Sequence, residues 1–454
     1  MPLGLYISVP FCRTKCSYCN FASDVFSKSA YENYVARVIE DIGRSRELAG
    51  QLGCAMDGDV DSIYLGGGTP SILAAEQLRR IFGAARELFR VAPDAEITVE
   101  CAPGTLTPEL IGTLAQCGVN RVSLGVQSFV DGEAQAVGRL HKRTTVLEEV
   151  ARLRQAGIGN INIDLIAGLP HQTKESWAYS LGETVALGAP HASVYMLEVD
   201  EDSRLGRELM AGGTRYHAHF VPDEEATAEF YEQACETLNA AGIRQYEISN
   251  FARAGAESRH NLKYWTRQPY IGFGVDAHSM LRAATSPAKA ASPSDAQTAA
   301  LKRCATQNQS SFTACEDCEA IRFATPDSLD AYMSRTPQSM TAVSTRAAIE
   351  ESLFLGLRLN RGVDLERLRA EFTAEAVAPF EAAISECKRD GLIENVLLES
   401  GLLEDGLLEK DATTVRLTAR GRLLSNEVFA RFLGEEISAR GEEVKVGTGH
   451  VNPR

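Results

Sequence analysis

The chain has 454 residues, 44% of them hydrophobic, which is enough for one large α/β barrel and a smaller domain. Its 61 acidic and 46 basic residues give a net charge of −15, which argues against a general nucleic-acid-binding protein, because such proteins present a basic face. The sequence shows neither a membrane-spanning apolar run nor a signal-peptide pattern. We therefore expect a cytoplasmic protein whose clustered cysteines bind metal instead of forming disulfides.

The first predicted element is a short apolar strand, residues 5–9, which leads into a cysteine-rich loop. Cys12, Cys16 and Cys19 follow with three and two residues between them. Thiolates at this spacing can converge on one soft metal centre, either an iron–sulfur cluster or zinc. Three ligands favour a 4Fe–4S cluster with one open iron. A zinc site would need a distant fourth ligand, since no histidine precedes His141.

From residue 31 helical and strand patterns alternate, which predicts βα units around a parallel sheet. About six units predict an α/β fold with a partial (β/α)6 barrel, and such a sheet places its chemistry at the C-terminal ends of the strands. The predicted helices are 31–48, 74–89, 108–116, 146–156, 175–186 and 224–240, and the predicted strands are 60–65, 96–100, 121–126, 160–166, 192–197 and 245–248.

Glycine and polar residues fall at the ends of successive predicted strands. A run of three glycines follows the second strand, where it would let a ligand approach the backbone closely, although a tight turn explains it equally well. An aspartate inside the apolar fifth strand is costly to bury without a partner. Each polar residue alone could have a purely structural role, with its hydrogen bonds made inside the protein, but together these residues predict one ligand site. The set is Gly66, Gly67, Gly68, Thr69, Glu100, Gln127, Ser128, Arg139 and Asp164.

The CxxxCxxC spacing after a first strand resembles the signature of the radical S-adenosylmethionine (radical SAM) superfamily. The segments GGGTPS, GVQSF, GRLHKRTT, NIDLIAGLP, YEISNFAR and YIGFGVDAHS are similar to its branch of oxygen-independent coproporphyrinogen III oxidases and HemW-type heme chaperones. This resemblance covers roughly residues 3–280 and resumes near residue 322.

The resemblance implies a 4Fe–4S cluster on Cys12, Cys16 and Cys19, with S-adenosylmethionine chelated at the open iron. It also implies that the glycine run holds the methionine end of this cofactor and that polar residues bind its ribose, carboxylate and neighbouring groups. One tyrosine would lie under the adenine or methionine portion, and another would pack against the cluster. The implied cofactor residues are Tyr6, Tyr18, Gly67, Gly68, Thr69, Glu100, Gln127, Arg139 and Asp164.

Two features separate the two branches of this group. The oxidases carry a further cysteine at the position of Phe21, and they have an N-terminal extension where this chain has four residues before the predicted strand. Both differences favour the chaperone type, which transfers heme to acceptor proteins and lacks coproporphyrinogen oxidase activity. The alternatives are an oxidase that decarboxylates coproporphyrinogen III by radical chemistry and a radical SAM enzyme with an unrelated small-molecule substrate.

Residues 259–265, RHNLKYW, contain an HNxxYW sequence that resembles the heme-binding motif of this group. Histidine is a common axial ligand of heme iron, and aromatic rings offer flat apolar surface to a porphyrin. The alternative is a structural histidine whose ring nitrogens are hydrogen-bonded within the protein, beside two aromatic residues of the hydrophobic core. The implied heme residues are His260, Asn261, Tyr264 and Trp265, and His278 and Cys101 are further candidates.

The composition divides the chain into a barrel domain (residues 1–282), a flexible insert (283–320), a C-terminal domain (321–440) and a disordered tail (441–454). The insert contains Cys304, Cys315 and Cys318, and the last two form a CxxC pair. We interpret this pair as incidental because no further ligand is near it, although metal binding stays open. Helices followed by two short strands, near 391–394 and 415–421, predict a winged-helix-like C-terminal domain. The resemblance implies that this domain helps to form the tetrapyrrole pocket.

The expected partners are heme, a heme-acceptor protein and an electron donor, and the sequence identifies neither protein. It leaves open peripheral membrane contact, a homodimer, the axial heme ligand, and the coupling of cofactor cleavage to heme transfer.

Overall fold

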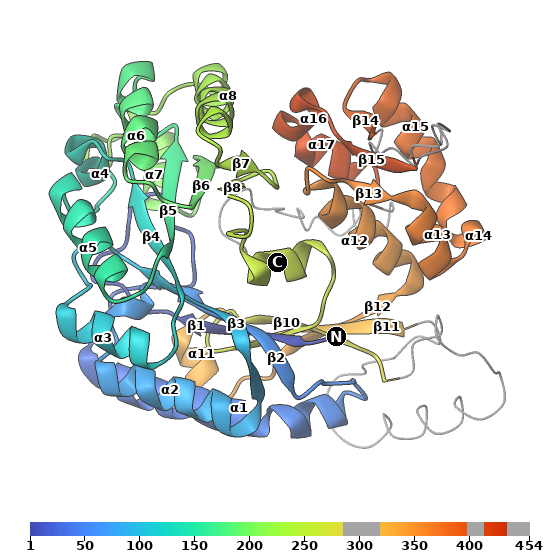
Figure 1. Cartoon of the computed structure of the whole chain (residues 1–454), viewed down its shortest axis with the longest axis horizontal. Coiled ribbons are helices and arrows are strands. Elements are labelled where there is room, and N and C mark those ends of the chain that lie inside the picture. Colours follow the sequence, from blue (N-terminus) through green and yellow to red (C-terminus); the bar gives the residue numbers. More distant parts are fainter. Residues whose placement is uncertain (285–317, 397–412, 434–454) are drawn as a thin grey trace, which may run out of the picture.

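The computed structural model describes residues 1–284, 318–396 and 413–433. Six consecutive strands in these ranges lie side by side and run parallel, which confirms the predicted partial barrel. Figure 1 shows them as one strongly curved sheet, with helices on its outer face. The strands are β1 (Leu3–Val9), β2 (Asp59–Gly67), β3 (Arg90–Cys101), β4 (Arg121–Gln127), β5 (Asn160–Ala167) and β6 (His191–Met196).

Each helix predicted before residue 240 is present. The helices predicted over 108–116 and 224–240 have the predicted ends, the other four are shifted by at most three residues, and two short helices are additional. Thr107 caps α3, because its hydroxyl accepts a hydrogen bond from Leu110 N. The helices are α1 (Lys28–Gln51), α2 (Ala75–Leu88), α3 (Pro108–Gln116), α4 (Asp131–Ala136), α5 (Arg143–Gln155), α6 (Lys174–Ala186), α7 (Arg204–Ala211) and α8 (Glu224–Ala240), with the 3-10 turns η1 (Pro70–Ile72) and η2 (Ala218–Phe220).

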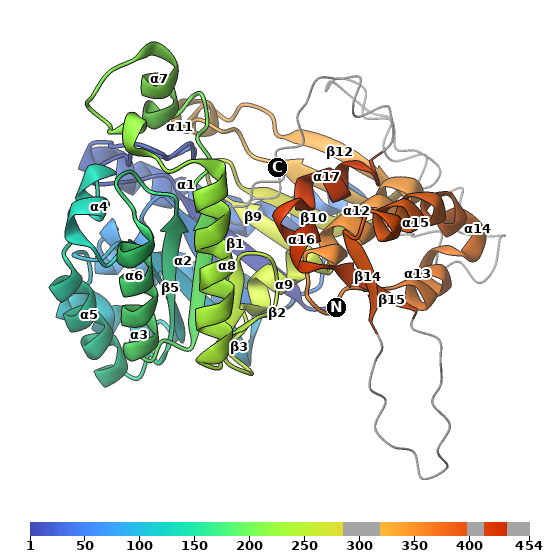
Figure 2. The same ribbon diagram turned by 90° about the horizontal axis from the view of Figure 1, so that it is seen from above.

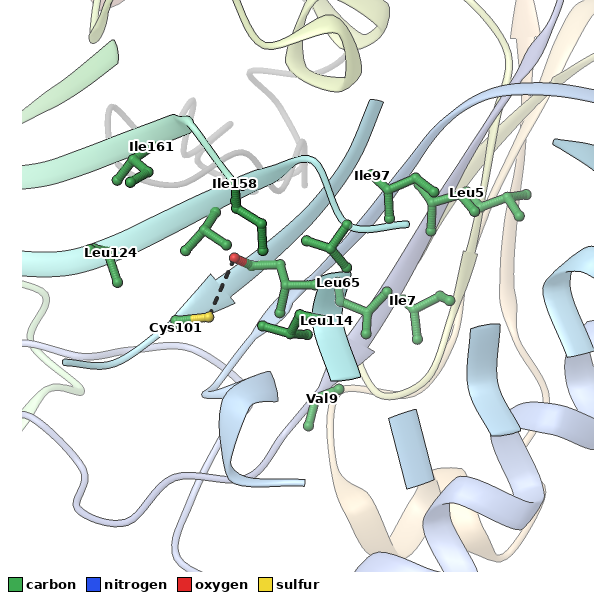
Figure 3. Close-up of a cluster of buried hydrophobic side chains, with 14 of the residues drawn as sticks. Leu5, Ile7, Val9, Leu65, Ile97, Cys101, Leu114, Leu124, Ile158 and Ile161 are labelled. Carbon is green, nitrogen blue, oxygen red and sulfur yellow. Dashed lines mark hydrogen bonds between the residues drawn. The ribbon is translucent and has the colours of Figure 1, made fainter. Parts of the chain in front are cut away.

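Alternation along the strands separates an apolar outer face from a polar inner face. Figure 3 shows part of the outer core, where Leu5, Ile7 and Val9 of β1 gather with Leu65 and Ile97 of the neighbouring strands. Because successive side chains of a strand point to opposite faces, the residues between them face the barrel interior. The interior thus receives serines, tyrosines, glutamates and an aspartate, and its polar character positions the candidate site.

Further strands extend both edges of the sheet. On one side β9 (Tyr270–Phe273) is parallel to β1, and β10 (His278–Arg282), β11 (Cys318–Ala324) and β12 (Ser339–Ser344) continue antiparallel. The sheet therefore continues past residue 321, where we placed the start of the second domain. On the other side, the single strand predicted over 245–248 is replaced by two short antiparallel strands. These are β7 (Arg244–Gln245) and β8 (Asn250–Ala252), because the chain turns back between them.

The C-terminal part combines helices with a small antiparallel sheet in the order β13-β15-β14, a winged-helix-like arrangement with one more strand than predicted. It shares a second core with α9 (Arg259–Trp265), which lies between it and the barrel (Figure 2). The remaining elements are α11 (Leu329–Met333), α12 (Thr345–Leu357), β13 (Val363–Asp364), α13 (Leu365–Phe372), α14 (Ala374–Val377), η4 (Ala378–Phe380), α15 (Glu381–Arg389), β14 (Ile393–Val396), β15 (Thr414–Leu417), α16 (Ala419–Leu423) and α17 (Ser425–Ala430).

Most of the predicted insert, with Cys304 and Cys315, and the predicted tail lie outside the described residues, whereas Cys318 begins β11. Within the described ranges, no helix combines the length and apolar character that crossing a bilayer requires.

Candidate functional site

The cysteine loop lies between β1 and α1 and is held by three backbone hydrogen bonds. Cys12 N donates to the carbonyl of Asp24, in the same loop, at 3.0 Å, and Ser17 N donates to Val137 O at 3.1 Å. Leu205 N, in α7, donates to Ser17 O at 2.8 Å. The loop conformation is therefore stabilised both from within and by the segments that follow α4 and begin α7.

The three thiols line a cavity at the C-terminal ends of β1 to β5, with an empty volume of about 660 Å³ that is partly open to solvent. We call it the cofactor cavity. It is lined by eight of the nine predicted cofactor residues: Tyr18, Gly67, Gly68, Thr69, Glu100, Gln127, Arg139 and Asp164. Tyr6 lies outside this lining, in a neighbouring cavity.

The fold itself explains the glycines after β2. Gly67 has φ +103°, and a Cβ on Gly68 would come within 2.7 Å of the Phe11 carbonyl oxygen. Their amides are already paired, since Gly67 N donates to Glu100 Oε2 at 3.1 Å and Gly68 N to Val9 O at 2.8 Å. The glycine run therefore shapes the cavity wall by close packing on β1, in agreement with the tight-turn interpretation.

Two side chains bring unpartnered polar atoms to the cofactor cavity. Gln127 is 1% exposed, has a left-handed φ of 67°, and its Oε1 has no hydrogen-bond partner among the described residues. Arg139 donates from Nη2 to the Tyr18 hydroxyl at 3.2 Å, and its Nε is also unpartnered there. Buried polar atoms are normally paired, and guanidinium groups pair well with carboxylates. This donor and acceptor set fits a polar ligand with a carboxylate, such as the methionine end of S-adenosylmethionine.

The two acidic residues of the cavity have different surroundings. The Asp164 carboxylate accepts hydrogen bonds from Ser123 Oγ at 2.8 Å and Asn162 Nδ2 at 2.7 Å, which satisfies its burial. Glu100 accepts from the Tyr64 hydroxyl at 2.8 Å. Burial raises the pKa of Glu100 to about 8, although the hydrogen bond from Tyr64 lowers it. Glu100 is therefore largely protonated at neutral pH.

The three cysteines of the loop, Cys12, Cys16 and Cys19, line one and the same cavity. Among the described residues, no group of three or more His, Cys, Asp and Glu side chains converges as the ligands of one metal ion do.

A second cavity adjoins the first and has an empty volume of about 540 Å³. We call it the inner cavity. Phe21, Ser23, Gly67 and Glu100 line both cavities, so the two are neighbours in the barrel interior. The other residues of the inner cavity are Tyr6, Ser8, Ala22, Tyr64, His260, Asn261, Tyr264 and Asp276.

The HNxxYW motif forms α9, whose first turn is anchored on one buried carboxylate. Glu96, 5% exposed on β3, accepts hydrogen bonds from Arg259 N at 2.9 Å and His260 N at 3.0 Å. The Ser258 hydroxyl caps the same end by accepting from Asn261 N. This anchor places three of the four motif side chains at the inner cavity.

His260 is hydrogen-bonded at both ring nitrogens. Nδ1 lies 2.9 Å from Ser62 Oγ, and Nε2 lies 2.9 Å from the Tyr264 hydroxyl. Burial lowers the pKa of His260 to about 3, with Lys263 acting in the same direction, so the ring is neutral. In this arrangement neither nitrogen is free to bind iron, and axial ligation requires one of these two hydrogen bonds to open.

Trp265 lies elsewhere. It packs in the second core beneath the Arg358 guanidinium, 4.3 Å from the ring centroid, and does not line the inner cavity. Of the further heme candidates, His278 pairs with Asp276 at 3.6 Å, and the Cys101 thiol bonds to the Val99 carbonyl within the outer core (Figure 3).

The sequence did not reveal Ser62, Tyr64, Glu96 or Asp276 as site residues. The first three sit on β2 and β3 at inward positions, alternating with apolar residues that face the core. This alternation was the available signal, since residues two apart on a strand share a face. Asp276 follows β9 with a left-handed φ of 53°, a conformation that the local sequence does not predict.

The chain matches two family models. The model of the radical SAM superfamily matches residues 6–181, and the HemN C-terminal domain matches residues 343–395. The solved coproporphyrinogen III oxidase (HemN) from Escherichia coli, described as a radical SAM enzyme, is similar in fold. Its TM-score is 0.72 at 21% identity, covering 95% of this chain and 90% of that one.

Among characterised proteins, the heme chaperone HemW of Bacillus subtilis is 34% identical over 431 residues, which is 95% of this chain and 99% of the relative. The HemW of Lactococcus lactis is 30% identical and covers 96% of this chain and 99% of its own length. The Escherichia coli HemW is 34% identical over 278 residues, 61% of this chain and 70% of the relative.

Proposed function

Because the chain belongs to the HemW family of heme chaperones within the radical SAM superfamily, we propose that it binds heme and transfers it to an acceptor protein. Superfamily membership implies a 4Fe–4S cluster and S-adenosylmethionine as cofactors. One observation carries the proposal. Three HNxxYW residues line an inner cavity that shares a wall with the cofactor cavity, so heme and cofactor sites would adjoin.

Cys12, Cys16 and Cys19 would hold the cluster, and the cluster would supply an electron to S-adenosylmethionine. Arg139 would pair with the methionine carboxylate, since its Nε is free of other partners among the described residues. Gln127 and Asp164 would receive the hydroxyl and amino groups of the same molecule. Tyr18 would orient Arg139 through their hydrogen bond.

The proposed heme site is the inner-cavity side of α9, with His260, Asn261 and Tyr264 in contact with the ligand and Trp265 in support. Iron ligation by His260 would begin with the opening of its hydrogen bond to Tyr264. The reason is that Tyr264, the partner of Nε2, lines the inner cavity, whereas Ser62, the partner of Nδ1, does not. Ser62 would keep the ring oriented through Nδ1, as a second hydrogen bond commonly does for histidine ligands.

A second candidate function is radical decarboxylation of coproporphyrinogen III. The adjoining cavities favour it, because a radical formed from the cofactor would reach a substrate in the inner cavity. Phe21 argues against it: this side chain lines both cavities at the position where the oxidases carry a further cysteine. A cytoplasmic location, an acceptor protein and an electron donor belong to the first proposal.

The test loads the full chain with iron and sulfide without oxygen and titrates it with heme. We expect stoichiometric heme binding that His260→Ala weakens at least tenfold, while the exposed His219→Ala has no effect. Tyr264→Phe keeps the fold and frees Nε2, so it should bind heme at least as tightly as the wild type. Protoporphyrinogen formed from coproporphyrinogen III and S-adenosylmethionine under reducing conditions would instead establish the oxidase.

A further inference from the structure

Three of the eight histidines of the chain lie on two adjacent surface turns and line neither the cofactor cavity nor the inner cavity. His171 is in the turn between β5 and α6, and His217 and His219 lie at the 3-10 turn η2. His171 and His219 are exposed, and His217 is half-buried. Because histidine is the commonest metal ligand in proteins, solvent-accessible histidines in contact form a candidate site. We call His171 and His217 the histidine pair.

The two rings of the histidine pair meet at one nitrogen each. His171 Nε2 lies 3.1 Å from His217 Nδ1, and the ring centroids are 5.0 Å apart with the ring planes at 67°. This contact is a hydrogen bond, in which one ring donates its N–H and the other ring accepts. A neutral imidazole carries its proton on either nitrogen, so the proton between the rings can move to the other nitrogen of the donor ring. Both facing nitrogens then offer a lone pair.

The separation of these two nitrogens matches that of neighbouring ligands on one ion. Imidazole nitrogens lie about 2.1 Å from a divalent transition ion. At that bond length, two ligands about 90° apart are separated by about 3.0 Å, and two tetrahedral ligands by about 3.4 Å. The observed 3.1 Å is closer to the square or octahedral value, which is the geometry that Cu²⁺ and Ni²⁺ prefer. The rings need only turn about their side-chain bonds to aim both lone pairs at one ion.

The backbone and one aromatic ring keep the histidine pair together. His171 N donates to the Phe220 carbonyl at 2.9 Å, and Phe220 N donates to the His217 carbonyl at 2.9 Å. The Phe220 ring stacks on the face of the His171 ring, 4.2 Å between centroids. His171 and His217 both have left-handed backbones, with φ of 67° and 62°, a conformation that is uncommon outside glycine. Two turns that are 46 residues apart in the sequence thus present their histidines to each other in a fixed arrangement.

We propose that His171 and His217 bind one divalent transition ion, such as Ni²⁺ or Cu²⁺, through Nε2 and Nδ1. Water fills the remaining coordination positions, since the described residues bring no third His, Cys, Asp or Glu ligand to the pair. Two nitrogen–metal bonds form and two bound waters leave the ion, which keeps its oxidation state, and no proton leaves the neutral pair. This site is separate from the proposed heme and cofactor sites, because neither histidine lines their cavities.

The test titrates Ni²⁺ into the cluster-loaded full chain, without oxygen, by isothermal titration calorimetry. His171→Asn and His217→Asn each remove one ligand, and asparagine tolerates a left-handed backbone, so both variants should keep the fold. His219→Asn is the matched control on an exposed histidine of the same turn as His217. We expect each pair variant to bind Ni²⁺ at least about tenfold more weakly than the wild type, and the control to bind it as the wild type does. Binding at any other site would persist in all variants.

Equal Ni²⁺ affinity in the wild type and the two pair variants would overturn the proposal, because the pair would then be a hydrogen bond and nothing more. An equal loss in His219→Asn would also overturn it. A second measurement needs no variant: Ni²⁺ should protect His171 and His217 of the wild type, but not His219, from modification by diethyl pyrocarbonate, as peptide mass spectrometry detects. Equal modification of the pair with and without Ni²⁺ would refute the proposal even where a variant fails to fold.

Discussion

The Glu96 carboxylate holds the N-terminal turn of the HNxxYW helix, α9. Its removal therefore tests whether this carboxylate stabilises the helix that carries the motif. The carboxylate accepts the backbone N–H groups of Arg259 and His260, at 2.9 and 3.0 Å, and Glu96 is itself 5% exposed. Glu96→Ala would leave these two donors without a partner. Each unpaired buried donor costs about 1–3 kcal/mol, and the lost charge at a helix N-terminus adds about 0.3–1 kcal/mol. We expect α9 to lose about 3 kcal/mol of local stability.

Hydrogen exchange followed by mass spectrometry measures this loss at residues 258–266. A loss of about 3 kcal/mol corresponds to exchange roughly a hundredfold faster in α9, if α9 opens locally. Asp94→Asn is the matched control, because Asp94 is exposed, pairs with Arg259 only at 3.6 Å, and should change stability by less than about 1 kcal/mol. Unchanged exchange of α9 in Glu96→Ala, or equal effects of the two variants, would refute the reasoning.

Two further predictions concern pH. Although burial opposes it, Arg322 and Arg267 hold the pKa of Glu351 below its usual value, so its contribution to stability exists above a pH of about 4.3 and is lost on acidification. Glu351→Gln should remove this dependence from urea unfolding and cost about 3–5 kcal/mol at neutral pH. The raised pKa of Glu100, about 8, predicts the opposite sign: stability should fall as pH rises from about 4.3 to 8, and Glu100→Gln should flatten the decline.

The strands of the barrel were predictable because each is an apolar run bounded by turn residues. β3 shows what the pattern leaves out. It starts at Arg90, six residues before its predicted start, because this part pairs with the start of β2, Asp59 with Arg90. Very short strands such as β7 and β13 form because they pair with a neighbouring strand, and they are too short to show an alternating hydrophobic pattern. Pairing between strands distant in the sequence, and not the strand propensity of the local residues, therefore explains the differences between prediction and structure.

The predicted residues of the cofactor cavity come together because parallel strands end at one edge of a sheet. The motif residues were harder to place. Ser62 and Tyr264 occupy the two nitrogens of His260, and Ser62 is 198 residues away in the sequence. Trp265 looked like a ligand residue from its motif but packs against Arg358 of the C-terminal domain. A motif fixes which residues occur together, whereas the partners that surround them come from the fold.

Glu100 links the two cavities physically. Its carboxyl accepts from the Tyr64 hydroxyl, and the Tyr64 ring lies 5.4 Å from the His260 ring. His260 in turn bonds to Tyr264. Glu100, Tyr64, His260 and Tyr264 thus form a continuous chain of adjacent side chains that leads from the cofactor cavity to the HNxxYW motif. Each of these four residues lines the inner cavity, so the wall that the two cavities share and the motif histidine belong to one packed group of side chains.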